Sequence, residues 1–350
     1  MARPTRGDHK QLMTSATLSG LPPPPPGKTG WPWTVETPPL PDARPDGTAW
    51  PRISIVTPSY NQGQFIEETI RSVLLQGYPN LEYIIIDGGS TDDSVEIIRK
   101  YERHLAYWVS EKDRGQSHAI NKGIRRISGD VWAYQNSDDL LTPSALATVA
   151  ARFADPSVSW VGGSSENFGT EAAGGVIPEN TARAKDYLCP WSRSMRYVFP
   201  FSGASYMKRD IIDRIGVFDE SFHYSMDIEY YCRAIFEGGC QLTLVPEVLA
   251  SWRWHGLSKT MGQGIAYAFR ADEMRIASRY AKFLSESERD QVEAELRYQE
   301  LVLPSREAMW LLAEGDRKGA LALLVKAGLT DWSMIASRPW LGALRRAIVR

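Results

Sequence analysis

The sequence predicts an α/β protein in which a mostly parallel sheet is flanked by helices and followed by a C-terminal helical region. From Arg52 to Phe153, short apolar runs alternate with stretches of helical periodicity. This alternation with short links implies right-handed crossovers between parallel strands. Past Gly264 the apolar spacing is helical throughout. With 43% hydrophobic residues in 350, the chain can bury a sizeable core.

Four short apolar runs have the character of buried parallel strands, which read as nearly continuous Val, Ile and Leu. They are Ile53–Thr57, Leu81–Ile86, Ala106–Val109 and Val131–Tyr134. Helical spacing, with capping residues or glycines at the ends, predicts helices between and after them. These helices are Phe65–Leu74, Ser90–Tyr101, Ser117–Ile127 and Ser144–Phe153.

The pattern is less regular beyond Val158. The glycine-rich stretch Gly162–Gly175 predicts loops, and Tyr206–Ile215 predicts a strand followed by a helix. A helix over Asp227–Glu237 and a strand over Gln241–Val245 follow. The expected C-terminal helices are Tyr267–Leu284, Glu288–Leu303, Pro304–Ala313, Arg317–Ala327 and Ile335–Val349. We therefore divide the chain into an N-terminal extension (1–50), an α/β domain (51–260) and a helical region (261–350).

The N-terminal extension is rich in proline. Eleven of the 22 prolines lie in Pro22–Pro51, and such a segment favours polyproline II over helix or sheet. A disordered tail is one interpretation, but disordered segments are poor in aromatic residues, and this one holds Trp31, Trp33 and Trp50. We expect residues 1–20 to be mobile and residues 31–50 to lie as a strap over the α/β domain.

Composition and missing motifs exclude several classes of protein. The balance of 40 basic and 42 acidic residues lacks the basic footprint of a nucleic-acid binder. Three cysteines without metal-ligand spacing exclude a disulfide scaffold and a cysteine zinc site, and they fit a reducing compartment. No apolar run reaches the ~18 residues of a membrane span, and the polar start shows no signal peptide. We therefore expect a cytoplasmic protein. Dinucleotide-binding, Walker, zincin and serine-hydrolase motifs are missing too.

Carboxylates at predicted strand and helix ends are the candidate functional groups. Asp138 and Asp139 follow the fourth strand, and a paired acid there suits Mg²⁺ or Mn²⁺; capping of the next helix is the alternative. Asp87 can hydrogen-bond a nucleobase or form an Asx-turn. Asp227 is either a helix cap or a catalytic carboxylate. His255 taken alone fits a structural histidine.

Five blocks in order resemble the family 2 glycosyltransferases of the GT-A fold. They are Ile53-Ser-Ile-Val-Thr-Pro-Ser-Tyr-Asn61, Ile70-Arg-Ser-Val73, Ile84-Ile-Ile-Asp-Gly-Gly-Ser-Thr-Asp-Asp93, Ser110-Glu-Lys-Asp-Arg-Gly-Gln-Ser-His-Ala-Ile-Asn-Lys-Gly123, and Gly129-Asp130 with Asn136-Ser-Asp-Asp139. The resemblance covers about Trp50–Thr260, and Gly30-Trp-Pro-Trp-Thr34 resembles a prefix on bacterial members. It implies the Rossmann-like sheet of nucleotide-diphospho-sugar transferases.

The resemblance implies roles for residues at the predicted strand ends. Thr57, Pro58 and Tyr60 would flank the nucleotide, Asp87 would accept hydrogen bonds from the base, and Arg114 would approach the diphosphate. The pair Asp138–Asp139 matches the DxD-type metal motif, with Asn136 where the first Asp often stands. Asp139 would contact the metal directly, and Asp138 would contact the ribose or the metal.

Two later segments also resemble family motifs. Met226-Asp-Ile-Glu-Tyr-Tyr-Cys-Arg233 places Asp227 at the general-base position, with Met226 replacing the preceding acid. Trp252-Arg-Trp-His-Gly-Leu-Ser-Lys-Thr260 places His255 and Lys259 near the diphosphate. The aromatic character of Trp252 suits the acceptor side, by stacking on a sugar ring or contacting a lipid carrier, and a core position is the alternative.

The implied activity is inverting, metal-dependent transfer of a sugar from a UDP-, GDP- or dTDP-linked donor to a hydroxyl of a glycan or glycolipid. Cell-surface polysaccharide or glycolipid synthesis is the expected setting. A nucleotide-sugar-binding module without catalysis is one alternative. A peripheral scaffold at the inner face of the membrane is another, because Arg338–Arg350 is basic, amphipathic and free of acids. Packing of this C-terminal helix on the catalytic domain accounts for the same pattern.

Overall fold

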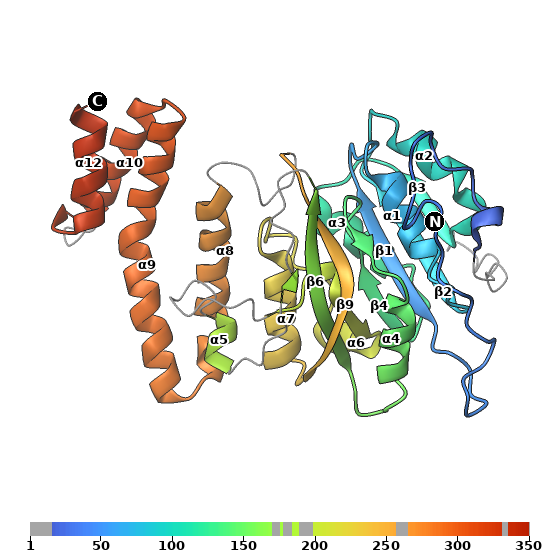
Figure 1. Ribbon diagram of the computed structural model, residues 1–350. Helices are drawn as coiled ribbons and strands as arrows, with labels where there is room; N and C mark the ends of the chain where they lie inside the picture. Colours follow the sequence, from blue (N-terminus) through green and yellow to red (C-terminus); the bar gives the residue numbers. More distant parts are fainter. Residues whose placement is uncertain are drawn as a thin grey trace, which may run out of the picture. The chain divides into compact units, whose positions relative to one another are not determined.

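The computed structural model describes residues 16–169, 176–177, 184–188, 199–256, 265–330 and 335–349 (Figure 1). The chain divides into two compact units. Unit 1 comprises Met1–Glu179, Pro200–Glu220 and Gly238–Arg253, and unit 2 comprises Asn180–Phe199, Ser221–Glu237 and Trp254–Arg350.

The strands that the structure describes form one nine-stranded sheet in the order β3-β2-β1-β4-β8-β6-β9-β5, with β7 paired to β6. They are β1 Ile53–Ser59, β2 Leu81–Asp87, β3 Tyr107–Ser110, β4 Val131–Tyr134, β5 Leu140–Leu141, β6 Trp160–Gly169, β7 Val176–Ile177, β8 Ser205–Lys208 and β9 Leu242–Trp254. The α/β class with a flanked sheet is confirmed. The sheet is mixed, because β3, β2, β1 and β4 pair in parallel while β8, β6, β7 and β5 pair antiparallel with their neighbours.

The parallel half brings the polar strand ends to one edge. In its register Ser59 of β1 lies beside Asp87 of β2, and Asp87 lies beside Ser110 of β3. On the other side of β1, Val56 pairs with Tyr134 of β4, just before Asn136. The predicted ligand-binding residues therefore meet at the carboxyl edge of the parallel strands.

Unit 1 contains five described α-helices and three 3-10 helices, of which α3 packs on β1 and β2. They are α1 Ile66–Leu74, α2 Ser94–Lys100, α3 Gln116–Ile124, α4 Ala145–Arg152 and α6 Asp210–Ile215, with the 3-10 helices η1 Leu18–Gly20, η2 Glu102–His104 and η3 Ser202–Ala204. In α1, Ile66, Ile70 and Val73 are fully buried, as their helical spacing predicts. Gly123 lets α3 approach β1 closely, since a Cβ there would lie 2.3 Å from a methyl group of Val56.

Within unit 1, the N-terminal segment is held against α1 by a buried arginine of that helix. Arg71 is fully buried, and its guanidinium donates hydrogen bonds to the backbone carbonyls of Pro22, Pro32 and Trp33 at 2.8–3.0 Å. Its guanidinium carbon also lies 5.3 Å from the ring centroid of Trp33. The extension therefore supplies the acceptors that a buried cation requires.

Part of the stretch expected to be mobile also packs on the core. Residues 1–15 lie outside the described part of the chain, but Ala16 and Leu18 contact core residues of unit 1. The backbone N–H of Leu18 donates to Glu36 at 2.5 Å. The mobility expected of residues 1–20 stays a prediction.

Two predicted breaks are continuous elements in the structure. Gly162–Gly169, expected as loop, belongs to β6, because its glycines allow close approach: a Cβ on Gly163 would lie 2.5 Å from Leu249. Pro304, expected to begin a new helix, lies inside α9, where Val302 and Ser305 on either side of it are buried.

Unit 2 is helical over its described residues. Its elements are α5 Ala184–Leu188, α7 Met226–Phe236, α8 Ile265–Tyr280, η4 Ala281–Phe283, α9 Glu286–Ala313, α10 Arg317–Thr330 and α12 Arg338–Val349. Glu229 of α7 is fully buried and binds Arg233, Arg279 and Tyr280, which ties α7 to α8. Among the described helices, none combines the length and the apolar character needed to cross a membrane.

Arg71→Met should destabilise the full chain by about 3 kcal/mol, because three buried carbonyls lose a charged donor. In a chain that lacks residues 1–49, the same substitution should change stability by less than about 1 kcal/mol, since its acceptors at positions 22, 32 and 33 are gone. Urea unfolding of the four proteins gives this double-mutant cycle. Equal effects in both backgrounds would contradict the anchoring role of Arg71.

Candidate active site

The first group of predicted residues lies at the end of β1. Thr57 is fully buried and its hydroxyl lies 3.1 Å from that of Tyr83, so it supports the strand from inside the sheet. Pro58 is buried in the same strand, whereas Tyr60, just past its end, is 59% exposed. Of these three residues, Tyr60 is therefore the one whose side chain is exposed to solvent.

Asp87 forms the Asx-turn that the sequence left as an alternative. Its carboxylate accepts hydrogen bonds from the backbone N–H groups of Gly89 and Ser90 and from the hydroxyls of Ser90 and Ser110, at 2.5–3.1 Å. The residue is fully buried. Asp87 thus fixes the loop after β2.

The segment Asn136–Asp139 after β4 is held by hydrogen bonds at both ends. The Asn136 amide donates to Oδ2 of Asp139 at 3.0 Å and accepts from Gln116 at 2.8 Å. Oδ1 of Asp139 accepts the backbone N–H of Arg253 at 2.9 Å, and its carbonyl accepts the hydroxyl of Thr69 at 2.8 Å. The carboxylate is therefore part of the packed interior as well as a strand-end group.

Burial and a neighbouring charge act together on Asp139. The residue is 1% exposed. Burial, and next the negative charge of Asp138, raise the pKa of its carboxyl well above the usual range, although Arg253 and Asn136 oppose the shift. A bound cation would relieve both effects.

These side chains fit a divalent cation that is completed by substrate oxygens. An ionised carboxylate has about four lone-pair sites, and each oxygen of Asp139 accepts one hydrogen bond. Asp138 is only partly buried. Among the described residues there is no group of three or more His, Cys, Asp or Glu side chains that could hold a metal ion. Mg²⁺ and related ions commonly use one or two carboxylates together with phosphate oxygens.

Sequence reasoning missed Arg253 and Glu68. Arg253 donates from Nε to the carbonyl of Asp138 at 2.8 Å and forms an ion pair with Glu68 at 2.9 Å. Arg253 lies within the family-like segment Trp252–Thr260, and this position is the sequence feature that could have identified it. Glu68 carried no signal beyond its place in the first turn of α1.

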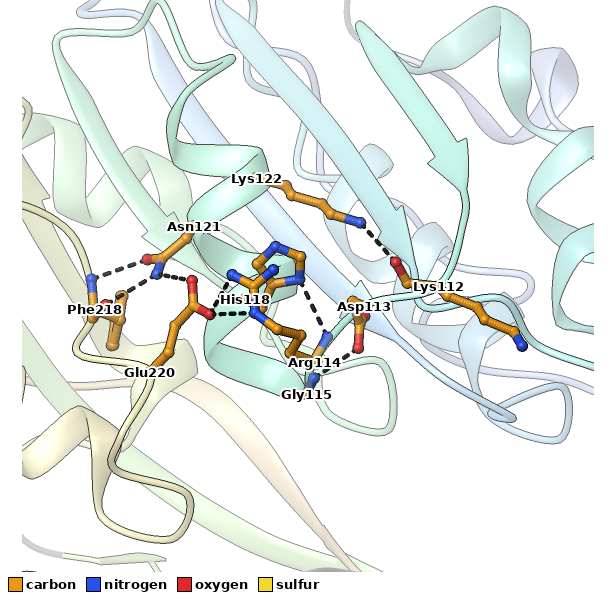
Figure 2. Close-up of polar contacts among 9 residues, drawn as sticks. All are labelled: Lys112, Asp113, Arg114, Gly115, His118, Asn121, Lys122, Phe218 and Glu220. Atoms are coloured by element: carbon orange, nitrogen blue, oxygen red, sulfur yellow. Dashed lines mark hydrogen bonds and ion pairs between the residues drawn. The ribbon is translucent and has the colours of Figure 1, made fainter.

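Arg114 lies in a polar cluster beside this edge (Figure 2). Its guanidinium binds Glu220 at 2.7 and 3.1 Å, and Glu220 also accepts from Asn121 at 3.2 Å. The pKa of the Glu220 carboxyl is lowered. Burial alone would raise this pKa, but the hydrogen bonds from Arg114 and Asn121 and the charge of Arg114 outweigh it. His118, which has no predicted role, accepts the backbone N–H of Arg114 at its Nδ1. Arg114 is 69% exposed, so it is restrained yet accessible.

The remaining predicted residues are spread over both units. Asp227 lies in the first turn of α7 in unit 2, where its Oδ1 accepts the backbone N–H of Ile228 at 2.9 Å. His255, also in unit 2, is 9% exposed. Trp252 in unit 1 stacks on Phe201 with a centroid separation of 5.4 Å. Lys259 lies outside the described residues. The structure therefore brings Asp87, Asp138 and Asp139 to one edge of unit 1.

Comparison with known proteins gives a consistent result. A family model described as glycosyl transferase family 2 matches residues 54–216. An uncharacterized glycosyltransferase of Mycobacterium tuberculosis is 33% identical over 192 residues, which cover 53% of this chain and 70% of the relative. The putative teichuronic acid biosynthesis glycosyltransferase TuaG of Bacillus subtilis is 41% identical over 98 residues, 26% of this chain and 38% of TuaG.

Two solved structures share the fold. S. aureus TarS 1-349 in complex with UDP-GlcNAc has a TM-score of 0.51 at 18% identity, covering 70% of this chain and 71% of that one. The mannosyltransferase PcManGT from Pyrobaculum calidifontis, in complex with GDP-Man and Mn²⁺, has a TM-score of 0.54 at 22% identity, covering 88% of this chain and 89% of that one. At these identities the likeness shows the fold alone.

Proposed function

The chain belongs to glycosyl transferase family 2 and is a glycosyltransferase, and on that premise we propose inverting, metal-dependent transfer of a sugar from a nucleotide-sugar to a hydroxyl acceptor. The observation that carries the proposal is that Asp87 ends β2 and Asp138–Asp139 follow β4, on either side of β1, at the carboxyl edge of the parallel strands. We assign the activity to residues 51–260, with residues 1–50 as an extension and 261–350 as a helical region.

The comparisons support a nucleotide-sugar donor. TarS binds UDP and UDP-GlcNAc, and PcManGT binds GDP-Man. We propose a UDP-, GDP- or dTDP-linked donor whose nucleotide lies against Tyr60 and the loop that Asp87 holds, with Arg114 approaching the diphosphate. The name of TuaG supports a role in polysaccharide synthesis. A glycan or glycolipid is the proposed acceptor, and His255, Lys259 and Trp252 keep their predicted roles.

The divalent cation, Mn²⁺ or Mg²⁺, would be held by Asp139 and Asp138. Bound there, it would stabilise the negative charge that develops on the departing diphosphate, by several kcal/mol. Asn136 and Arg253 orient the carboxylate of Asp139 through the hydrogen bonds described above. The presence of Mn²⁺ with PcManGT supports this assignment.

Asp227 is the proposed general base. It would accept the proton of the attacking hydroxyl, and a single displacement with one base inverts the anomeric centre. A binding module without catalysis is the weaker alternative, because the acids at 87, 138, 139 and 227 are all present. Thermal-shift and hydrolysis measurements with a panel of nucleotide-sugars, with and without Mn²⁺, test the proposal and identify the donor. No Mn²⁺-dependent binding of any donor would refute it.

Asp139→Asn and Asp138→Asn should each abolish the Mn²⁺-dependent part of nucleotide binding and sugar transfer. Asn at 139 keeps one acceptor oxygen but turns its NH2 toward the second donor, so stability should fall by about 1–3 kcal/mol, whereas Ala would leave both donors unpaired. Calorimetric titration of nucleotide with and without Mn²⁺ measures the effect. Asp155→Asn, in an exposed turn, is the matched control, and unchanged metal dependence in both test variants would exclude the assignment.

Asp227→Asn should lower kcat by at least roughly 100-fold while donor affinity stays nearly constant. The Asn oxygen can still accept the N–H of Ile228, so stability should change by less than about 1 kcal/mol. Steady-state kinetics with the identified donor and a binding titration separate the two effects. Asp210→Asn, which alters the first turn of α6 instead, should leave kcat unchanged. A collapse of donor binding would make Asp227 a binding residue.

Contact of unit 2 with an anionic membrane surface is the remaining part of the proposal. Trp340, Ala343 and Ala347 of α12 are buried against α9 and α10, so packing within unit 2 accounts for the apolar half of this helix. The other half exposes Arg338, Arg345 and Arg346 together with Leu341 and Ile348. Such a basic amphipathic surface favours anionic lipid headgroups.

Reversal of two of these charges, Arg338→Glu with Arg345→Glu, should abolish flotation of the protein with phosphatidylglycerol vesicles at low salt. Binding to neutral phosphatidylcholine vesicles should be absent in all variants. The matched control is Arg99→Glu with Lys100→Glu, two exposed basic residues at the end of α2. Equal flotation of both double variants would argue against a lipid-binding role for α12.

A further inference from the structure

A chain of contacts joins the N-terminal extension to the candidate metal carboxylates. The indole N–H of Trp33 donates to Oε1 of Glu68 at 3.2 Å, and Oε2 of the same carboxylate binds Arg253 at 2.9 Å. Arg253 then donates from Nε to the carbonyl of Asp138 and from its backbone N–H to Asp139. Every link lies within unit 1.

The environment of Arg253 restricts the orientation of its guanidinium group. Its guanidinium carbon lies 4.9 Å from the ring centroid of Phe65 and 4.3 Å from that of Phe168. The side chains of Arg253 and Glu68 are only 13% and 16% exposed. A planar guanidinium flanked by two rings and paired with a carboxylate has little freedom to rotate, so its hydrogen bond to Asp138 is fixed in direction.

Glu68 is fixed in turn by Trp33, which is 5% exposed and is itself held by the buried Arg71. The two carboxylate oxygens of Glu68 thus have separate partners, one from the extension and one from β9.

We propose that Glu68 and Arg253 are positioning residues for the metal-binding segment, and that Trp33 makes their geometry depend on the N-terminal extension. The inference rests on the proposed function, in which Asp138 and Asp139 hold the cation. Residues that orient metal ligands through hydrogen bonds typically alter metal affinity by about 10- to 100-fold when changed. The extension then acts on cation binding without contacting the cation.

The test measures Mn²⁺ affinity directly, from the electron paramagnetic resonance signal of free Mn²⁺, in the presence of UDP, GDP or dTDP, whichever the full chain binds most tightly. Glu68→Gln keeps an acceptor for Trp33 but loses the charge opposite Arg253, and Arg253→Lys loses the directed bond from Nε. Both should weaken Mn²⁺ binding by about 10- to 100-fold. Trp33→Phe, which keeps the ring and loses the N–H, should weaken it by about threefold.

A matched control and a double variant test whether Trp33 acts on Mn²⁺ binding through Glu68. Trp50→Phe removes an equivalent indole hydrogen bond in the same extension, but one made to Pro41, and should leave Mn²⁺ affinity unchanged. In a Glu68→Ala background, Trp33→Phe should have no further effect. An additive effect there would overturn the route through Glu68.

Two results separate failure of this inference from failure of the proposed function. If the unaltered chain binds Mn²⁺ with a nucleotide and Glu68→Gln and Arg253→Lys bind it equally well, the positioning role is overturned and the function stands. A lower melting temperature with unchanged Mn²⁺ affinity would likewise overturn it, since that is the result of a purely structural role. If the unaltered chain shows no nucleotide-dependent Mn²⁺ binding, both proposals fall.

Discussion

A guanidinium in a protein interior must have its N–H groups paired, and the pairing of Arg71 determines how the N-terminal extension lies. A buried arginine without partners would cost several kcal/mol. The extension supplies carbonyls from Pro22, Pro32 and Trp33. Pro32 and Trp33 lie in a turn that is closed by hydrogen bonds from the backbone N–H groups of Trp33 and Thr34 to the carbonyl of Gly30. A proline offers a carbonyl acceptor while lacking an N–H of its own. A fourth N–H of the guanidinium donates to the hydroxyl of Tyr101 at 3.2 Å.

Helix α1 therefore contacts both the N-terminal extension and the Asp138–Leu141 segment through residues of its last turns. Arg71 binds the extension, while Thr69 donates to the carbonyl of Asp139 and Ser72 accepts the backbone N–H of Leu141. Trp31 of the extension adds a hydrogen bond to the carbonyl of Leu141 at 2.9 Å. Since the same short helix contacts both segments, the placement of the extension and that of the Asp138–Leu141 segment are physically linked.

The parallel half of the sheet could be predicted from the sequence because buried parallel strands leave an unmistakable apolar run. The prediction for β4 matches its bounds, and those for β1 and β2 differ only at their carboxyl ends. Strand β6 could not be predicted, since the glycines that permit its close packing on Leu249 look like loop residues. The carboxylates at 87, 138 and 139 could be placed at one edge by strand order alone. The contact of Arg253 with Glu68, 185 positions away, could not be predicted, because no sequence feature near either residue indicates it.

The electrostatics of the segment after β4 also account for a departure from the family pattern. Where the first acid of the metal motif often stands, this chain has Asn136, and its amide donates to Oδ2 of Asp139 at 3.0 Å. An aspartate there could not donate, and it would bring a further negative charge against a carboxyl whose pKa is already raised by burial and by Asp138. Asn136 instead satisfies one oxygen of Asp139 without adding charge. With Arg253 satisfying the other oxygen, the buried carboxylate has a fixed orientation, which suits the divalent cation that we propose for this site.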